Sequence, residues 1–156
     1  GGVQAQLVST MPPPFYGNSI METMLKAIAQ AEDYILIEDQ YFRAPILSDA
    51  ILDQMLAKPN LKLIVITNPV NEWTDPGCWP TYLEIAIFSG FGNSRFGIYQ
   101  LKSFDWADTG CILCVDEVQG YYKDLFIHSK LVIIDDKYLQ TDCSVKFMDT
   151  ERILGK

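Results

Sequence analysis

Histidine and basic residues are scarce in this sequence. One histidine occurs in 156 residues, and 12 Lys and Arg stand against 20 Asp and Glu, for a formal net charge of −8. Affinity for a nucleic-acid backbone comes largely from clustered Lys and Arg, and the sequence contains no basic run. This composition disfavours a protein that binds nucleic acid through its phosphates.

Long apolar runs are also missing. No stretch approaches the roughly 18 apolar residues that indicate a membrane-spanning helix, and the start shows no signal-peptide pattern. We expect no membrane-spanning segment, and the compartment stays open.

Cysteine is limited to four residues, of which Cys111 and Cys114 have the spacing of a zinc or redox pair. The residues between them are apolar and the run continues into Val115. Strand alternation would place the two thiols on opposite faces, unlike the knuckle that holds a metal. We expect buried free thiols and no metal.

The chain is 49% hydrophobic, which is enough for one domain with its own core. We expect residues 1–156 to form a single domain. Apolar patterning predicts strands at 4–9, 34–37, 61–66, 95–101, 111–118 and 131–134. Helices are predicted from a capping box at Ser19, from Ser48 or Asp49, and from Tyr82. This alternation predicts an α/β domain.

Residues 68–80 are rich in Pro, Gly, Asn and Trp, which predicts a long loop. Its Trp73 and Trp79 would suit contact with an acyl chain or a membrane surface, and burial as anchors of the loop is an equal alternative.

The single histidine stands beside a lysine at the mouth of a predicted strand. His128 and Lys130 precede the apolar run Leu131–Ile134, which ends at Asp135. Positions i and i+2 of a strand share a face about 6.6 Å apart, so one phosphate would reach both side chains. An imidazole can attack phosphorus while a cation neutralises the phosphoryl oxygens. A hydrogen-bonded structural histidine is the alternative on spacing alone.

Three further sequence features occur in a characteristic order. They are Tyr-Ile-Leu-Ile-Glu-Asp-Gln-Tyr-Phe at 34–42, His128-x-Lys130-x4-Asp135, and Asp-Thr-Glu at 149–151. The first resembles the Tyr-Ile-Glu-Asn-Gln-Tyr-Phe strand that opens the second catalytic half of phospholipase D superfamily enzymes, the second is similar to the signature of that superfamily, and the third resembles its acidic segment. The resemblance implies a mixed, mostly parallel sheet flanked by helices on both faces.

The resemblance also implies a function. It points to a phosphodiester hydrolase or transphosphatidylase half-domain that acts on a phospholipid or related phosphodiester through a phosphohistidine, without a cofactor. Two histidines are needed for this chemistry, one as nucleophile and one to protonate the leaving group. A second phospholipase D-like half, in the same polypeptide or in a homodimer, is therefore the expected partner.

The same resemblance suggests roles for individual residues. His128 would be the nucleophile or general acid and Lys130 the phosphate clamp. Glu151, or Asp149 of the same segment, would orient a histidine, while Gln40 and Ser144 would contact the substrate. Asp135 lies about 23 Å from His128 along an extended strand, which favours a structural role in a turn.

One segment departs from the family pattern. Six residues after Asp135 the family has Gly-Ser-x-Asn, whereas this chain has Asp142, Cys143, Ser144 and Val145. The missing glycine and asparagine leave two alternatives open. One is a catalytically inactive domain with a structural or binding role, and the other is a nuclease of the same family, which the net charge disfavours.

Overall fold

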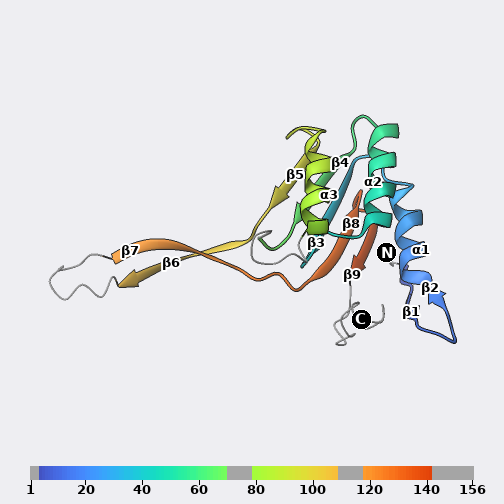
Figure 1. The fold of residues 1–156 in the computed structure, drawn as a ribbon, viewed down its shortest axis with the longest axis horizontal. Coiled ribbons are helices and arrows are strands. Elements are labelled where there is room, and N and C mark those ends of the chain that lie inside the picture. Colours follow the sequence, from blue (N-terminus) through green and yellow to red (C-terminus); the bar gives the residue numbers. More distant parts are fainter. Residues whose placement is uncertain (1–3, 70–78, 109–117, 142–156) are drawn as a thin grey trace.

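A five-stranded sheet forms the centre of the computed structural model, which describes residues 4–69, 79–108 and 118–141 (Figure 1). In spatial order its strands are β5 (Phe96–Tyr99), β4 (Lys62–Ile66), β3 (Tyr34–Asp39), β8 (Lys130–Ile134) and β9 (Tyr138–Thr141). β3, β4 and β5 are parallel, whereas β8 runs antiparallel to both β3 and β9. The predicted α/β class and mixed sheet are confirmed, although within this five-stranded sheet antiparallel pairings are as frequent as parallel ones.

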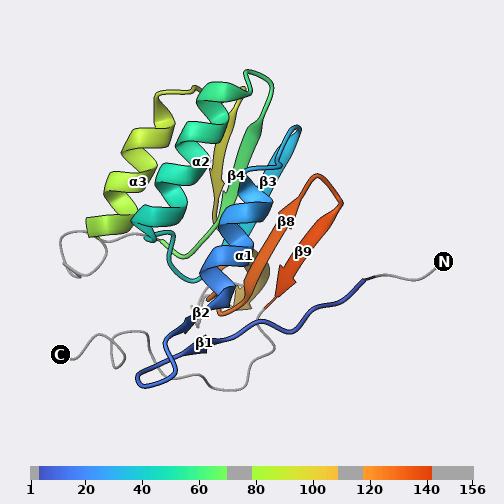
Figure 2. The ribbon, with the colours of Figure 1, turned by 90° about the vertical axis from the view of Figure 1, so that its right-hand side faces the viewer.

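Three helices, α1 (Ser19–Ile28), α2 (Pro45–Ala57) and α3 (Trp79–Ser89), pack on one face of this sheet (Figure 2). We expected helices on both faces. The described helices cover one, because the strand order β3, β4, β5 advances in one direction and right-handed crossovers then place α2 and α3 on the same side. The buried core lies between these two layers and consists of Ala27, Ile28, Ala31, Ile35, Phe42, Ile51, Met55, Leu61, Leu63, Val65, Phe88, Phe96, Val132 and Ile134.

The helix starts differ from the predicted ones. α2 begins at Pro45, before Ser48, because the fixed φ of proline suits the first helical position. Ser19 is the first residue of α1, and the N-cap residue before it, Asn18, makes no side-chain capping bond. The Ser19 hydroxyl instead donates to the Ser9 carbonyl at 2.6 Å and accepts from the Ser9 N–H at 2.8 Å. α3 begins at Trp79, within the predicted loop, of which residues 70–78 lie outside the described part.

The strand expected at 4–9 does not form. The strand pair there is β1 (Thr10–Met11) with β2 (Gly17–Asn18), joined across the three prolines. Three successive prolines withhold three backbone donors, and in this chain they lie in the connection between the two short strands.

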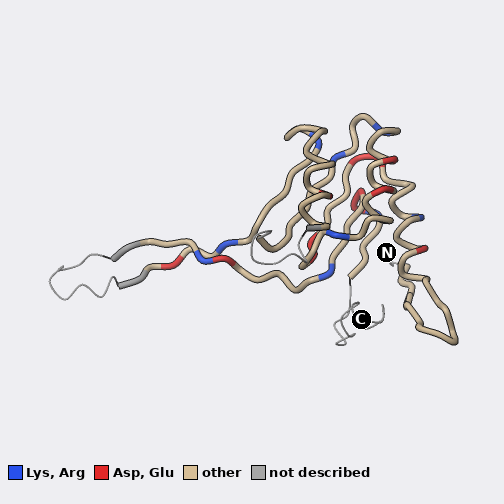
Figure 3. Tube along the Cα trace, in the orientation of Figure 1, with Lys and Arg blue, Asp and Glu red and all other residues tan. Residues whose placement is uncertain are grey.

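A two-stranded hairpin, β6 (Lys102–Asp108) with β7 (Val118–Asp124), projects from the body (Figure 1). Phe104 lies on one face of it, with its ring centroid 5.0 Å from that of Trp106 and 5.3 Å from that of Tyr122. Gly120 makes room for this cluster, since a Cβ there would come within 2.6 Å of the Phe104 ring. Basic and acidic positions are interspersed on the hairpin and along the rest of the trace (Figure 3). The strand predicted at 111–118 lies outside the described residues except for Val118.

Asp135 ties the far end of β8 to the segment that precedes β3. Its carboxylate accepts hydrogen bonds from the backbone N–H groups of Glu32, Asp33 and Tyr34 at 2.8, 2.9 and 2.8 Å. Its φ of 52° is in the left-handed region, which Asp and Asn tolerate better than other side chains. Burial acts to raise the pKa of Asp135, but these three bonds outweigh it and the pKa lies below its usual range.

We expect Asp135→Asn to lower the free energy of unfolding by about 1.5 to 3 kcal/mol at neutral pH, since hydrogen bonds to a charged group are lost and the turn is kept. A lowered folded pKa contributes stability above the ordinary Asp value of about 3.9 and loses it as the pH falls through the folded value. The difference between the two proteins should therefore shrink toward pH 3 in urea titrations.

Asp53→Asn, on the exposed side of α2, is the matched control and should change stability by less than about 0.5 kcal/mol. An Asp135→Asn loss that is the same at pH 7 and pH 3 would show that the carboxylate charge does not act in this way.

Candidate active site

The carboxyl end of β3 lies beside the start of β8, at one end of these two neighbouring strands. The antiparallel register pairs Asp39 with Lys130, and the Lys130 Nζ lies 3.5 Å from Asp39 Oδ1. The Ser129 hydroxyl donates to Glu38 Oε1. Because neighbouring residues of a strand point to opposite faces, these two contacts lie on opposite faces of the sheet, with Asp39 and Lys130 on the helix side.

His128 lies next to this pair, just before β8. The residue is exposed, and its ring lies nearly parallel to that of Phe126, with centroids 6.3 Å apart and an angle of 24° between the planes. The ammonium of Lys130 donates to the backbone carbonyls of His128 and Ser129, at 3.3 Å each. Within the described part of the chain the imidazole has no hydrogen-bond partner, so it is available to solvent and to a ligand.

Asn68, at the end of β4, holds the segment that carries His128. Its Oδ1 accepts from the backbone N–H of Ile127 at 2.7 Å, and its Nδ2 donates to the carbonyls of Ile127 and Gln40 at 3.0 and 3.3 Å. This buried amide replaces a strand neighbour for Ile127 and fixes it against the end of β3. Sequence analysis missed Asn68; its position directly after a buried strand was the available signal.

Asp39 is only partly exposed, and burial raises its pKa, while the neighbouring Lys130 charge acts in the opposite direction. A carboxyl group with this environment takes up a proton at higher pH than an ordinary Asp. Asp39 stands at the position where the resembled strand has asparagine. This substitution adds a negative charge beside the lysine that was predicted to hold phosphate.

The other predicted site residues divide into two groups. Gln40 lies at the end of β3, where its carbonyl also accepts from the Thr67 hydroxyl at 3.2 Å. Asp135 lies at the opposite end of β8 from Lys130, in the turn before β9. Ser144, Asp149 and Glu151 lie outside the described residues, as do Trp73 and all four cysteines.

Within residues 4–69, 79–108 and 118–141, no group of three or more His, Cys, Asp or Glu could hold a metal ion. No helix of these ranges is long and apolar enough to cross a membrane.

Comparison with known proteins identifies the fold. The sequence matches no protein-family model and no curated protein. Among solved structures, NucT from Helicobacter pylori, a phospholipase D family protein, superposes with a TM-score of 0.52 at 18% sequence identity. The chain has a phospholipase D-like fold. The match covers 84% of this chain and 69% of NucT.

A second solved structure, described as the phospholipase D family member Nuc from Salmonella typhimurium, has a TM-score of 0.44 and 17% identity. This match covers 80% of the present chain and 61% of Nuc. The likeness to NucT, at 18% identity, establishes the fold alone, and the activity has to be argued from the residues of the site.

We expect Asn68→Asp to destabilise the connection to His128, because it keeps the acceptor for the Ile127 N–H but turns a donor toward two carbonyls into a second acceptor. Leaving buried polar groups unpaired costs about 1 to 3 kcal/mol. Hydrogen exchange of the Ile127 amide should accelerate, and the urea midpoint should fall.

Asn93→Asp, in the exposed turn after α3, serves as the control and should leave both quantities unchanged. Unaltered protection of the Ile127 amide in Asn68→Asp would mean that the side chain does not hold this segment.

Proposed function

We propose that this chain is a phosphodiester hydrolase or transphosphatidylase half-domain that acts on a phospholipid or related phosphodiester through a phosphohistidine. The observation that supports this most directly is the exposed His128 beside Lys130, at the end of β3 in a phospholipase D-like fold. An imidazole nucleophile and a nearby cation are the two groups that attack on a phosphodiester requires.

The reaction has two steps. An imidazole nitrogen of His128 attacks phosphorus, the bond from phosphorus to the leaving oxygen breaks, and an acid gives that oxygen a proton. Water, or an alcohol in transphosphatidylation, then attacks the phosphohistidine while a base takes its proton, which restores the imidazole. The acid and base would come from the histidine of a second phospholipase D-like half, in the same polypeptide or in a homodimer.

Lys130 is the proposed phosphate clamp, and its ion pair with Asp39 determines how readily it can act. A phosphate that approaches the ammonium must share it with the carboxylate, whose side chain is 36% exposed, as is that of Lys130. Protonation of Asp39 would release the lysine, because the carboxyl then carries no charge. The proposed role of Glu151 or Asp149 is to orient a histidine, and Gln40 and Ser144 are the proposed substrate contacts.

A catalytically inactive domain remains the second candidate. It is favoured by the absence of the glycine and asparagine that the family has around Ser144. A nuclease is the third, and the net charge of −8 disfavours it. Contact with a membrane surface through Trp73 or Trp79 is part of the proposal for a lipid substrate.

We expect the chain, supplied with a second half, to hydrolyse a short-chain phosphatidylcholine faster than a generic aryl phosphodiester or single-stranded DNA. His128→Ala should reduce turnover by at least about 10³-fold, since a nucleophile is lost. EDTA should have no effect on the rate.

Lys62→Ala, an exposed lysine at the opposite end of the sheet, is the control and should keep full activity. Full turnover by His128→Ala would remove His128 from the mechanism, and absence of turnover on all three substrates would favour the inactive domain.

Anion binding should be measurable without turnover. We expect sulfate to bind with a millimolar dissociation constant, about −4 kcal/mol, and to shift the ring resonances of His128. Asp39→Asn should tighten binding about three- to fivefold at pH 7, because it removes a like charge near the anion.

This advantage should vanish as the pH falls through the raised pKa of Asp39, since the wild-type carboxyl then becomes neutral as well. Sulfate keeps its charge over this range, and the other titrating groups are common to both proteins. Asp53→Asn is the control. Equal affinities of Asp39→Asn and wild type at pH 7 would contradict the proposed competition for Lys130.

A further inference from the structure

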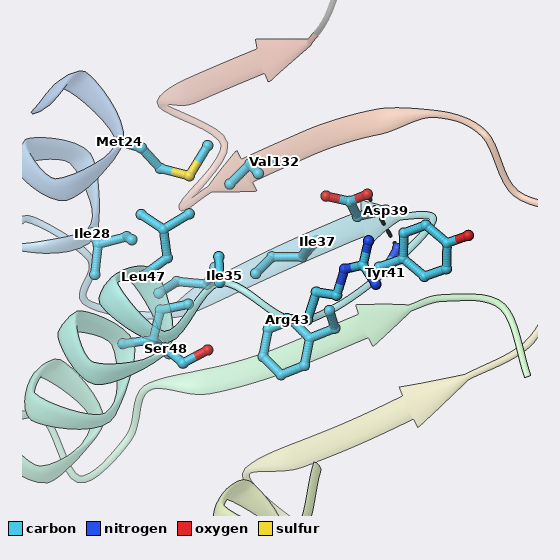
Figure 4. Close-up of a pocket in the computed structure, with 13 residues that line it drawn as sticks. Met24, Ile28, Ile35, Ile37, Asp39, Tyr41, Arg43, Leu47, Ser48 and Val132 are labelled. Atoms are coloured by element: carbon cyan, nitrogen blue, oxygen red, sulfur yellow. Dashed lines mark hydrogen bonds between the residues drawn. The ribbon is translucent and has the colours of Figure 1, made fainter. Parts of the chain in front are cut away.

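A cavity adjoins the candidate site on the helix side of the sheet. It has a volume of about 70 Å³ and lies between β3, β8, α1 and α2 (Figure 4). A buried water needs roughly 10 to 15 Å³ on this measure, so the cavity has room for a short chain of several carbons. Its apolar wall is formed by Met24, Ile28, Ile35, Ile37, Leu47, Ile51 and Val132.

The polar atom inside the cavity is the hydroxyl of Ser48. This residue is 3% exposed, and its oxygen has no hydrogen-bond partner in the described part of the chain. Figure 4 shows the hydroxyl on the cavity side of α2, directed away from the helix. Buried hydroxyl groups without a partner are unfavourable and uncommon, so a ligand that offers an acceptor oxygen would satisfy it.

The opening of the cavity leads to the proposed phosphate site. Ile35, Ile37 and Asp39 follow one another along the same face of β3, and all three line the cavity. Asp39 in turn lies 3.5 Å from Lys130. Arg43 also lies at this rim, with its guanidinium 4.1 Å from the centre of the Tyr41 ring. The surface thus changes from charged at the rim, where Asp39, Lys130 and Arg43 lie, to apolar inside.

Building on the function proposed above, we propose that this cavity binds the hydrocarbon portion of the phosphodiester whose phosphate lies at Lys130. The ligand class is an alkyl or acyl chain with one oxygen acceptor for Ser48, as an ester or ether provides. A nucleotide fits this surface poorly, because a base is recognised by several hydrogen bonds to its edge or by stacking on open aromatic rings. The polar group inside the cavity is one hydroxyl, and the walls are mainly aliphatic. Of the two aromatic lining residues, Phe42 is buried, and the Tyr41 ring already carries the Arg43 guanidinium on one face.

The test is a binding measurement with hexyl phosphate, methyl phosphate and 1-hexanol, followed through the methyl resonances of Ile35, Ile37 and Val132 and the ring resonances of His128. Each methylene removed from water contributes up to about fourfold in affinity. We expect hexyl phosphate to bind at least about tenfold more tightly than methyl phosphate. Hexyl phosphate and 1-hexanol should both shift the cavity methyl groups, and methyl phosphate should not.

Ser48→Leu should abolish the preference for the hexyl chain, because the leucine side chain would occupy the cavity. Ser48→Ala, which removes the hydroxyl without filling the space, should retain it. If Ser48→Leu does not fold, Ile37→Phe replaces it, with Leu36→Phe on the opposite face of β3 as its control. The two phosphates compared on the wild-type protein need no variant.

Equal affinity for the two phosphates, without shifts of the cavity methyl groups, would overturn the inference. If both ligands still shifted His128 in that case, the phosphate site would stand and the cavity alone would fail. Shifts of the cavity methyl groups by 1-hexanol, with no phosphate acting on His128, would overturn the link between cavity and phosphate and with it the proposed function. A thymidine oligonucleotide that shifts the same methyl groups would overturn the assignment to a hydrocarbon chain.

Discussion

The antiparallel pairing of β3 with β8 is the contact on which the rest of this structure depends. It joins the parallel part of the sheet, β3 to β5, to the antiparallel part, β8 and β9. Because the strands run in opposite directions, the acidic end of β3 meets the beginning of β8, where His128 and Lys130 stand. A parallel arrangement of the same two strands would have placed these groups at opposite ends of the sheet.

Much of this arrangement follows from local patterns in the sequence. The apolar runs at 34–37, 61–66 and 131–134 are strands because their β-branched residues suit a buried sheet, and the structure confirms them. The position of His128 and Lys130 at the mouth of a strand was also visible in the sequence, and so was the resemblance that predicted the fold. What remained hidden depends on partners that are distant in the chain.

Asn68 and Asp39 illustrate this limit. The position of Asn68 after a buried strand was visible in the sequence, but its bonds to Ile127 and Gln40, 59 and 28 positions away, were not. The ion pair of Asp39 required the register of β3 against β8, and that register is set when the whole sheet forms. The hairpin β6–β7 was missed for a different reason. Its alternating aromatic residues indicate a strand, but its aromatic face is exposed and no other described element covers it, so the pattern does not mark a buried core strand.

Asp135 has a consequence for the order in which this chain can fold. Its carboxylate accepts hydrogen bonds from residues 101 to 103 positions earlier, so β3 gains β8 as its second neighbour only after about a hundred further residues have been made. During synthesis at about 5 to 20 residues per second, β3 would wait for several seconds as an open edge, paired with β4 alone. Exposed strand edges invite association with other chains. Until β8 has left the ribosome, β3 therefore presents an unpaired edge to other chains.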